Sequence, residues 1–340
     1  MKKRMERQIM TTARRWFFTL AVAAATATPL AAYNDQVTHP HITQYAVQKS
    51  VLYKDPSIMF NLGLPPANRQ FYSYRARVGG WTWFLPNIDY GVSSLISEAT
   101  WDEDQGALPL SHFFDPVLTR ALTLRLYGEV GTKSWHWALE NEGPSSIAGG
   151  LASQSYSLAD AQDYLNQALT YNSGSPQEAE RQRGSAIGNV YLCLGHAVHH
   201  IQDMAQPQHT RNDVHLDSRV AGFFIPLIEY NPSRYEAYAE QRDNTLDGLA
   251  AGATPVFPGS SDFKVAKDFW TNSKSTGIAQ DTNNRFVSQG TNFTIINGQA
   301  NLGFYLSPQP LGSTEIPVTD LFATEGVPVP DQIHFICSLS

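Results

Sequence analysis

The sequence predicts an all-α fold, and three observations support this prediction. Apolar residues recur at the helical period in several long segments between the amino terminus and about residue 251. Serine, aspartate and proline stand where such segments begin, which is typical of helix starts. From about residue 252, glycine, proline, serine, threonine and asparagine become frequent. We therefore expect a multi-helical body at 33–251, followed by a loop- and hairpin-rich segment at 252–340.

The composition is that of a globular protein with one large domain or two. Of the 340 residues, 42% are hydrophobic and only 16% are charged, which argues against disorder. The formal net charge of −7 provides no basic surface for nucleic-acid phosphates. Nucleic acid is therefore not an expected partner, although bound metal ions would supply local positive charge.

Residues 1–32 are predicted to be an export signal. A basic stretch precedes the apolar run WFFTLAVAAATATPLAA, which is short, rich in alanine and interrupted by Pro29. These features argue against a membrane-spanning helix. ARRWFF also resembles a twin-arginine signal, so the general secretory route and the twin-arginine route both stay open. Cleavage after Ala32 would leave Tyr33 as the new amino terminus.

Helices are predicted in order along the body. HPHITQYAVQKSVLY (39–53) carries apolar residues at helical spacing, and DPVLTRALTLRLYG (115–128) has Pro116 in its first turn. SLADAQDYLNQALTY (157–171) opens with a sequence resembling a capping box. YEAYAEQRDNTLDGLAAG (235–252) ends in glycine, as helices often do.

The longest predicted helix covers 175–204, with Ser175 as its cap and apolar residues recurring at the helical period. Cys193 lies within this helix, and a buried free thiol is the expected state. Beyond the body, NFTIINGQANLGFYL (292–306) predicts a hairpin that turns at Asn297 and Gly298.

A cluster of histidines marks the end of the longest helix. Five of the ten histidines lie in GHAVHHIQDMAQPQHTRNDVH (195–215). His196 and His200 are four residues apart, and their HAVHH differs by one letter from the HExxH of zinc proteases. Ala197 takes the place of the glutamate that serves as general base there. The protease interpretation is therefore disfavoured.

His199 and Asp203 form a second pair that shares one helical face with Gly195, whose missing side chain would leave room for an ion cluster. Pro207 should end the helix, and a chain reversal there would bring His209 and His215 back toward the same ion pocket. Imidazole and carboxylate together suit Zn²⁺. Capping or packing alone is the less favoured explanation for so many histidines in one window.

His199, Asp203 and His209 stand in the pattern H-x3-D-x5-H, preceded by LG and containing P-x-H. Three further short elements accompany this pattern: THPHIT (38–43), SHFFDP (111–116) and RYE (234–236). Together, over roughly residues 33–240, they resemble the zinc-dependent phospholipase C and single-strand nuclease superfamily. That resemblance implies a multi-helical zinc enzyme.

The resemblance also implies further zinc ligands. THPHIT assigns His39, with His41 as the alternative, and SHFFDP assigns His112. RYE assigns Glu236, for which Glu229 is a competitor. Members of the family hold three zinc ions. The implied ligands are the amine and carbonyl of Tyr33 with His39 and Asp203 on one ion, His112 and His199 with bridging Asp203 on the second, and His209, His215 and Glu236 on the third.

An acidic residue upstream of the HFFDP element is expected to orient or deprotonate the attacking water. ISEATWDED offers four candidates, of which Asp102 and Asp104 are favoured over Glu98 and Glu103. Zinc would lower the pKa of bound water, and no covalent nucleophile is expected because the sequence has no G-x-S-x-G element.

Two features depart from the family pattern. Its better-known members have a histidine four residues before the late glutamate, whereas Pro232 stands there in this chain, so His215 is the substitute. Family members also usually close with a hydrophobic helix, and this chain ends in DQIHFICSLS.

The segment RQFYSYRARVGGWTWFLPNIDY (69–90) bears on the substrate. Its aromatic residues, which include Trp81 and Trp83, would suit a choline head group, a lipid interface or unstacked bases, although most are expected in the core. HFFDP and RND look more like bacterial phospholipases C than the nucleases. We therefore expect an exported, monomeric phospholipase C that acts on a phospholipid such as phosphatidylcholine at a membrane surface. The alternatives are a single-strand nuclease and a zinc-binding relative without turnover.

Overall fold

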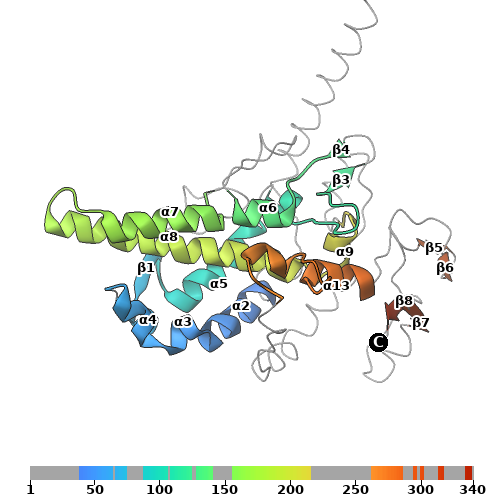
Figure 1. Ribbon diagram of the computed structural model, residues 1–340, viewed down its shortest axis with the longest axis horizontal. Helices are drawn as coiled ribbons and strands as arrows, with labels where there is room; N and C mark the ends of the chain where they lie inside the picture. The colour runs from blue at the N-terminus through green and yellow to red at the C-terminus, as the bar shows by residue number, and fades with distance from the viewer. Residues whose placement is uncertain are drawn as a thin grey trace, which may run out of the picture. The chain divides into compact units, whose positions relative to one another are not determined.

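The computed structural model describes residues 38–63, 66–74, 87–105, 108–124, 128–140, 155–215 and 262–285, and four later strands between 294 and 338. Helix predominates over strand in these residues, as the sequence predicts (Figure 1). No described helix combines the length and apolar character that crossing a membrane requires. The predicted export signal, Tyr33, Trp81, Trp83, Glu229, Glu236 and the predicted helix at 235–252 lie outside the described residues.

The described residues form two compact units. The first unit comprises those between 38 and 110 and between 136 and 200. The second unit comprises those between 111 and 135, between 201 and 215, and from 262 onward. Each unit therefore draws on segments that are far apart in the sequence.

The first unit begins with three short helices, α2 (Thr38–Lys49), α3 (Val51–Lys54) and α4 (Pro56–Asn61). The single helix expected at 39–53 is divided at Ser50, whose hydroxyl accepts a hydrogen bond from the Tyr53 amide at 3.3 Å and so caps α3. A 3-10 turn follows at Ala67–Arg69. Strands β1 (Phe71–Tyr74) and β2 (Ile88–Gly91) then pair antiparallel, with Phe71 opposite Gly91.

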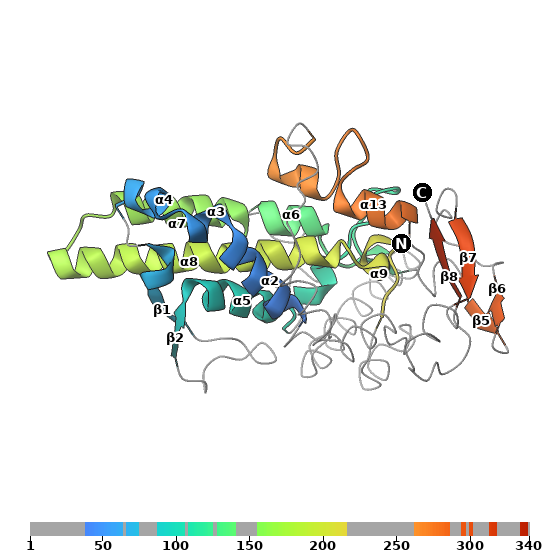
Figure 2. The same ribbon diagram turned by 90° about the horizontal axis from the view of Figure 1, so that it is seen from below.

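The longer helices of the unit are α5 (Val92–Glu103), α7 (Leu158–Thr170) and α8 (Pro176–Asp203), with the short α6 at Ser134–Leu139. Helix α7 lies alongside α8 in both views (Figures 1 and 2). The predicted capping box of α7 is confirmed, because Ser157 and Asp160 exchange side-chain to backbone hydrogen bonds at 3.1 and 2.9 Å. The predicted cap of α8 is also confirmed, because the Glu178 amide donates to the Ser175 hydroxyl at 3.2 Å.

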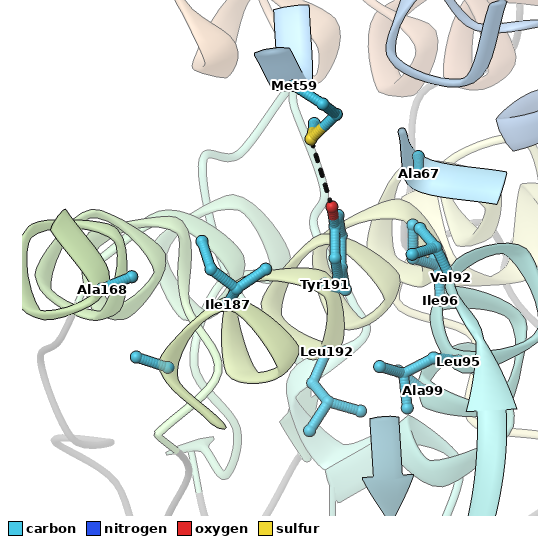
Figure 3. Close-up of a cluster of buried hydrophobic side chains, with 11 residues drawn as sticks. Met59, Ala67, Val92, Leu95, Ile96, Ala99, Ala168, Ile187, Tyr191 and Leu192 are labelled. Atoms are coloured by element: carbon cyan, nitrogen blue, oxygen red, sulfur yellow. Dashed lines mark hydrogen bonds between the residues drawn. The ribbon is translucent and has the colours of Figure 1, made fainter. Parts of the chain in front are cut away.

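The core of the first unit lies between α8, α5, α4 and the residues around β1 (Figure 3). Tyr191 of α8 donates a hydrogen bond to Gln70 at 3.2 Å and approaches the Met59 sulfur at 3.6 Å. Burial raises the pKa of Tyr191 to about 12, so its hydroxyl remains a donor. Cys193 on the same helix is a buried free thiol, as predicted.

Helix α5 packs against α8 at Gly195 (Figure 2). A Cβ atom there would lie 2.3 Å from the Ile96 carbonyl oxygen and 2.5 Å from the Ala99 Cβ atom. The expectation that Gly195 leaves room for an ion cluster is therefore wrong, because the backbone of α5 occupies that space.

In the second unit, the helix expected at 115–128 does not form over the described residues of that segment. Asp115 Oδ1 accepts hydrogen bonds from the Val117 and Leu118 amides at 3.0 and 3.1 Å, which forms a turn instead. Asp115 and Arg120 then pair through their backbones and through a 3.0 Å side-chain contact. Strands β3 (Thr123–Leu124) and β4 (Gly128–Glu129) follow. A local side-chain turn has thus outcompeted helical propensity.

The remaining elements of the second unit are α9 (Pro207–Thr210), a 3-10 turn at Ala266–Phe269, α13 (Ile278–Arg285) and four strands. β5 (Thr294–Ile296) pairs antiparallel with β6 (Gln299–Asn301), and Ile296 stands opposite Gln299. This pairing confirms the hairpin predicted around Asn297 and Gly298. β7 (Ser313–Pro317) pairs antiparallel with β8 (His334–Ser338).

Candidate metal centre

Three consecutive carboxylates end helix α5 in the first unit. Asp102 and Glu103 form its last turn, Asp104 follows as the cap, and all three are fully buried. The carboxyl end of a helix carries partial negative charge, so buried carboxylates there require positive charge or strong hydrogen-bond donors. The close packing at Gly195 brings this end of α5 to the histidines of α8.

Glu103 is held between His196 and His200. One carboxylate oxygen accepts a hydrogen bond from Trp137 Nε1 at 2.9 Å and lies 3.1 Å from His200 Nε2, and the other contacts His196 Nδ1. Tyr156 stacks on the His196 ring with centroids 4.4 Å apart. The HAVHH pair thus faces a carboxylate from α5. The spacing of the two histidines in the sequence indicated their common face but not this partner.

Asp102 and Asp104 have different surroundings. Asp102 Oδ2 accepts a hydrogen bond from the Tyr74 hydroxyl at 2.8 Å. Asp104 Oδ1 lies 3.5 Å from Nε2 of His199, a predicted zinc ligand. Asp104, one of the two acids favoured from the sequence, therefore lies beside a predicted ligand.

His39 lies beside His199. It lies in the first turn of α2, and its ring centroid is 4.2 Å from that of His199. The start of α2 is fixed to α5, because the Ser97 hydroxyl donates to the Pro40 carbonyl at 2.6 Å. His39 is 1% exposed, and His199 and Asp104 are fully buried. The first unit thus gathers two predicted ligand histidines and one acid in a place shielded from water.

The second unit gathers another predicted set around Asp203. Its Oδ2 atom lies 2.9 Å from His112 Nδ1 and 3.3 Å from His209 Nδ1. Asp203 and His112 are fully buried, and His209 is 1% exposed. The Asp203 carboxylate therefore contacts both imidazoles.

His215 lies beside His209. Their rings are nearly parallel, with centroids 4.9 Å apart, and their Nε2 atoms are 3.2 Å apart. His215 Nδ1 donates to the Asp213 carbonyl at 3.0 Å, which places its proton on Nδ1 and its lone pair on Nε2. The neighbouring Asp203 carboxylate favours the same tautomer of His209. Both Nε2 lone pairs then face each other, and the Gln206 side-chain amide donates to the Nε2 lone pair of His215 at 3.5 Å.

The protonation of His209 fits a ligand role. Burial lowers the pKa of His209, and this effect exceeds the opposing influence of Asp203. The nearby His215 and His112 lower it further. His209 is therefore neutral at neutral pH, which is the form that binds metal.

The described residues thus include buried groups of histidine and carboxylate side chains that could hold a metal ion. In the first unit the structure places His199 beside His39 and beside Asp104. In the second it places Asp203 beside His112 and His209, and His209 beside His215. The implied distribution of ligands over three ions depends in part on Tyr33 and Glu236, which are not among the described residues.

Comparisons with known proteins found no relative of this chain. No family model, curated protein or solved structure matches this chain.

Proposed function

We propose that the chain is an exported zinc-dependent phospholipase C, which hydrolyses the glycerol–phosphate ester of phospholipids such as phosphatidylcholine. The observation that carries the proposal is the arrangement around Asp203 and His209. One carboxylate oxygen faces two imidazole nitrogens, and the Nε2 lone pairs of His209 and His215 are 3.2 Å apart. Two facing lone pairs repel unless a proton or a cation lies between them.

A zinc ion satisfies this arrangement better than a proton. An N–H···N hydrogen bond is strongest in the plane of the donor ring, and the His209 and His215 rings are stacked rather than end to end. Imidazole and carboxylate donors in a buried position are the ligands that Zn²⁺ favours. In this proposal the second unit contributes Asp203 with His112 to one zinc site and the Nε2 atoms of His209 and His215 to another, and the first unit contributes His39 and His199.

The proposed chemistry uses few protein groups. When bound, zinc would lower the pKa of water so that hydroxide is available at neutral pH, and it would neutralise charge on the phosphate. The Asp104 carboxylate orients the attacking water and accepts its proton. Water adds to phosphorus, the bond to the glycerol oxygen breaks, and the proton held by Asp104 is returned to that oxygen, so that the products are diacylglycerol and a phosphorylated head group.

The test is phosphocholine release from phosphatidylcholine by the mature protein, with and without a zinc chelator. Single-stranded and duplex DNA are assayed in parallel, and bound zinc is measured by mass spectrometry. Asp203→Asn should abolish release, whereas Asp163→Asn, at an exposed position on α7, is the matched control and should not. Digestion of single-stranded DNA without phosphocholine release would replace this proposal with a nuclease. Bound zinc with neither activity would indicate a non-catalytic relative.

A further inference from the structure

The segment that carries His209 and His215 (residues 207–215) is fixed by contacts from three other parts of the second unit. The first contact joins it to the HFFDP element, because the Phe114 amide donates to the His209 carbonyl at 3.0 Å. The other two involve asparagine side chains: Asn212 within the segment bonds Thr123, and Asn283 bonds the segment from α13. The sequence patterns assigned neither asparagine a role of its own.

Asn212 reverses the chain between the two histidines. Its φ of 56° lies in the left-handed region, which asparagine and glycine adopt more readily than other residues. Its side-chain amide pairs with both backbone groups of Thr123 in β3. The Thr123 amide donates to Asn212 Oδ1 at 2.6 Å, and Asn212 Nδ2 donates to the Thr123 carbonyl at 2.8 Å. The Asn212 side chain therefore forms the pair of hydrogen bonds with Thr123 that the backbone of a neighbouring strand would form.

Asn283 of α13 holds the same segment from another direction. It is 3% exposed, and its Nδ2 donates to the Thr210 carbonyl at 2.6 Å. Its own carbonyl accepts a hydrogen bond from the buried guanidinium of Arg211. The contacts of Asn283 and Asn212 thus fall on residues 210–212, between His209 and His215.

We propose that Asn212 and Asn283 are positioning residues that keep the imidazoles of His209 and His215 side by side. Neither asparagine is proposed to touch zinc or substrate. The consequence for metal binding rests on the proposed function, in which this imidazole pair holds a zinc ion. Loss of groups that orient metal ligands typically lowers metal affinity about 10- to 100-fold.

Three variants and one control separate the effect of the asparagine hydrogen bonds from the effect of the backbone conformation at Asn212. Asn212→Ala removes both amide bonds and the preference for positive φ, whereas Asn212→Gly removes the bonds but keeps the backbone conformation accessible. Asn283→Ala removes the bond to Thr210. The control is Asn272→Ala in the same unit, where the side chain also bonds backbone groups, among them Lys274 N at 3.0 Å and Asp268 O at 3.3 Å.

The first measurement needs no metal. Histidine-selective NMR of the metal-free protein should show a contact between the ring protons of His209 and His215, which are assigned with single histidine variants. We expect Asn212→Ala and Asn283→Ala to abolish this contact, Asn212→Gly to weaken it, and Asn272→Ala to leave it unchanged. Circular dichroism confirms that each variant is folded, and Asn212→Gly replaces Asn212→Ala if the latter does not fold.

The second measurement is zinc affinity by chelator competition, together with the visible spectrum of the Co²⁺-substituted protein. Affinity should fall about 10- to 100-fold in Asn212→Ala and Asn283→Ala. An unchanged ring contact in these variants, or an equal loss in Asn272→Ala, would overturn the positioning role. If the wild-type protein binds no zinc but the ring contact still depends on both asparagines, the proposed function fails while the positioning role stands.

Discussion

Replacing Gly195 by alanine tests how α5 and α8 bring the first group of residues together. The added Cβ atom would lie 2.3 Å from the Ile96 carbonyl oxygen and 2.5 Å from the Ala99 Cβ atom, well inside normal contact. Since the nearest obstacle is backbone, the two helices must separate to accept it. Asp104 and His199, which lie beyond this crossing on their respective helices, should then move apart.

The magnitude follows from two opposing effects. Glycine to alanine within a helix is worth about 1 kcal/mol in favour of alanine. Overpacking of a core typically costs about 1–3 kcal/mol, and the upper end applies when a backbone carbonyl is in the way. We expect Gly195→Ala to lower the free energy of unfolding by about 2 kcal/mol on balance, which combines these two values.

Gly184→Ala is the matched control, because Gly184 lies on the same helix and a Cβ atom there would have no neighbour within 4 Å. It should stabilise the protein by about 1 kcal/mol. Urea denaturation followed by circular dichroism gives both values, and zinc content reports the Asp104 and His199 group. If Gly195→Ala proves as stable as Gly184→Ala, the close helix contact is not present in solution.

Three further predictions concern single side chains. Asp203→Asn should lower zinc affinity at least about 10-fold, since the carboxylate that faces His112 and His209 loses its charge, and unchanged affinity in chelator competition would contradict this role. Because burial lowers the pKa of His209, the unfolded chain binds more protons below pH 6.5, so the metal-free protein should lose stability on acidification. His209→Gln should flatten that pH dependence in thermal unfolding, and an unchanged slope would refute it. Burial and the nearby Asp102 raise the pKa of Glu98 in the folded protein, so stability falls as pH rises above the unfolded carboxyl value of 4.5, where the unfolded chain ionises first, and the loss is complete above the raised folded pKa. Glu98→Gln should therefore raise the melting temperature at pH 8 more than at pH 4, and an equal effect at both would count against it.

Local patterns in the sequence predicted the local structure well. The capping box at Ser157 and the start of α8 at Ser175 follow from short-range hydrogen bonds, so a few adjacent residues specify them. The hairpin around Asn297 and Gly298 is equally local. The segment at 115–128 was predicted wrongly, because the Asp115 turn and the pairing with Arg120 override its helical pattern.

For the candidate site, the sequence patterns named residues but not the contacts between them. Helical spacing places His199 and Asp203 on one face, but no local pattern reveals that Glu103 faces His196 and His200. That contact depends on which side of α5 packs against α8. The role of Gly195 was misjudged for the same reason, because the space beside a glycine is filled by a helix about a hundred residues away in the sequence.

The buried thiol of Cys193 has a practical consequence. Burial raises its pKa, and the thiolate is the reactive form, so the folded protein protects this sulfur from alkylating reagents and oxidants. The thiol approaches the Ser155 carbonyl, just before α7, at 3.9 Å. Reagents can therefore reach it only when this region opens. The rate at which an alkylating reagent labels Cys193, followed by peptide mass spectrometry, therefore reports how often this part of the molecule opens, without an engineered cysteine.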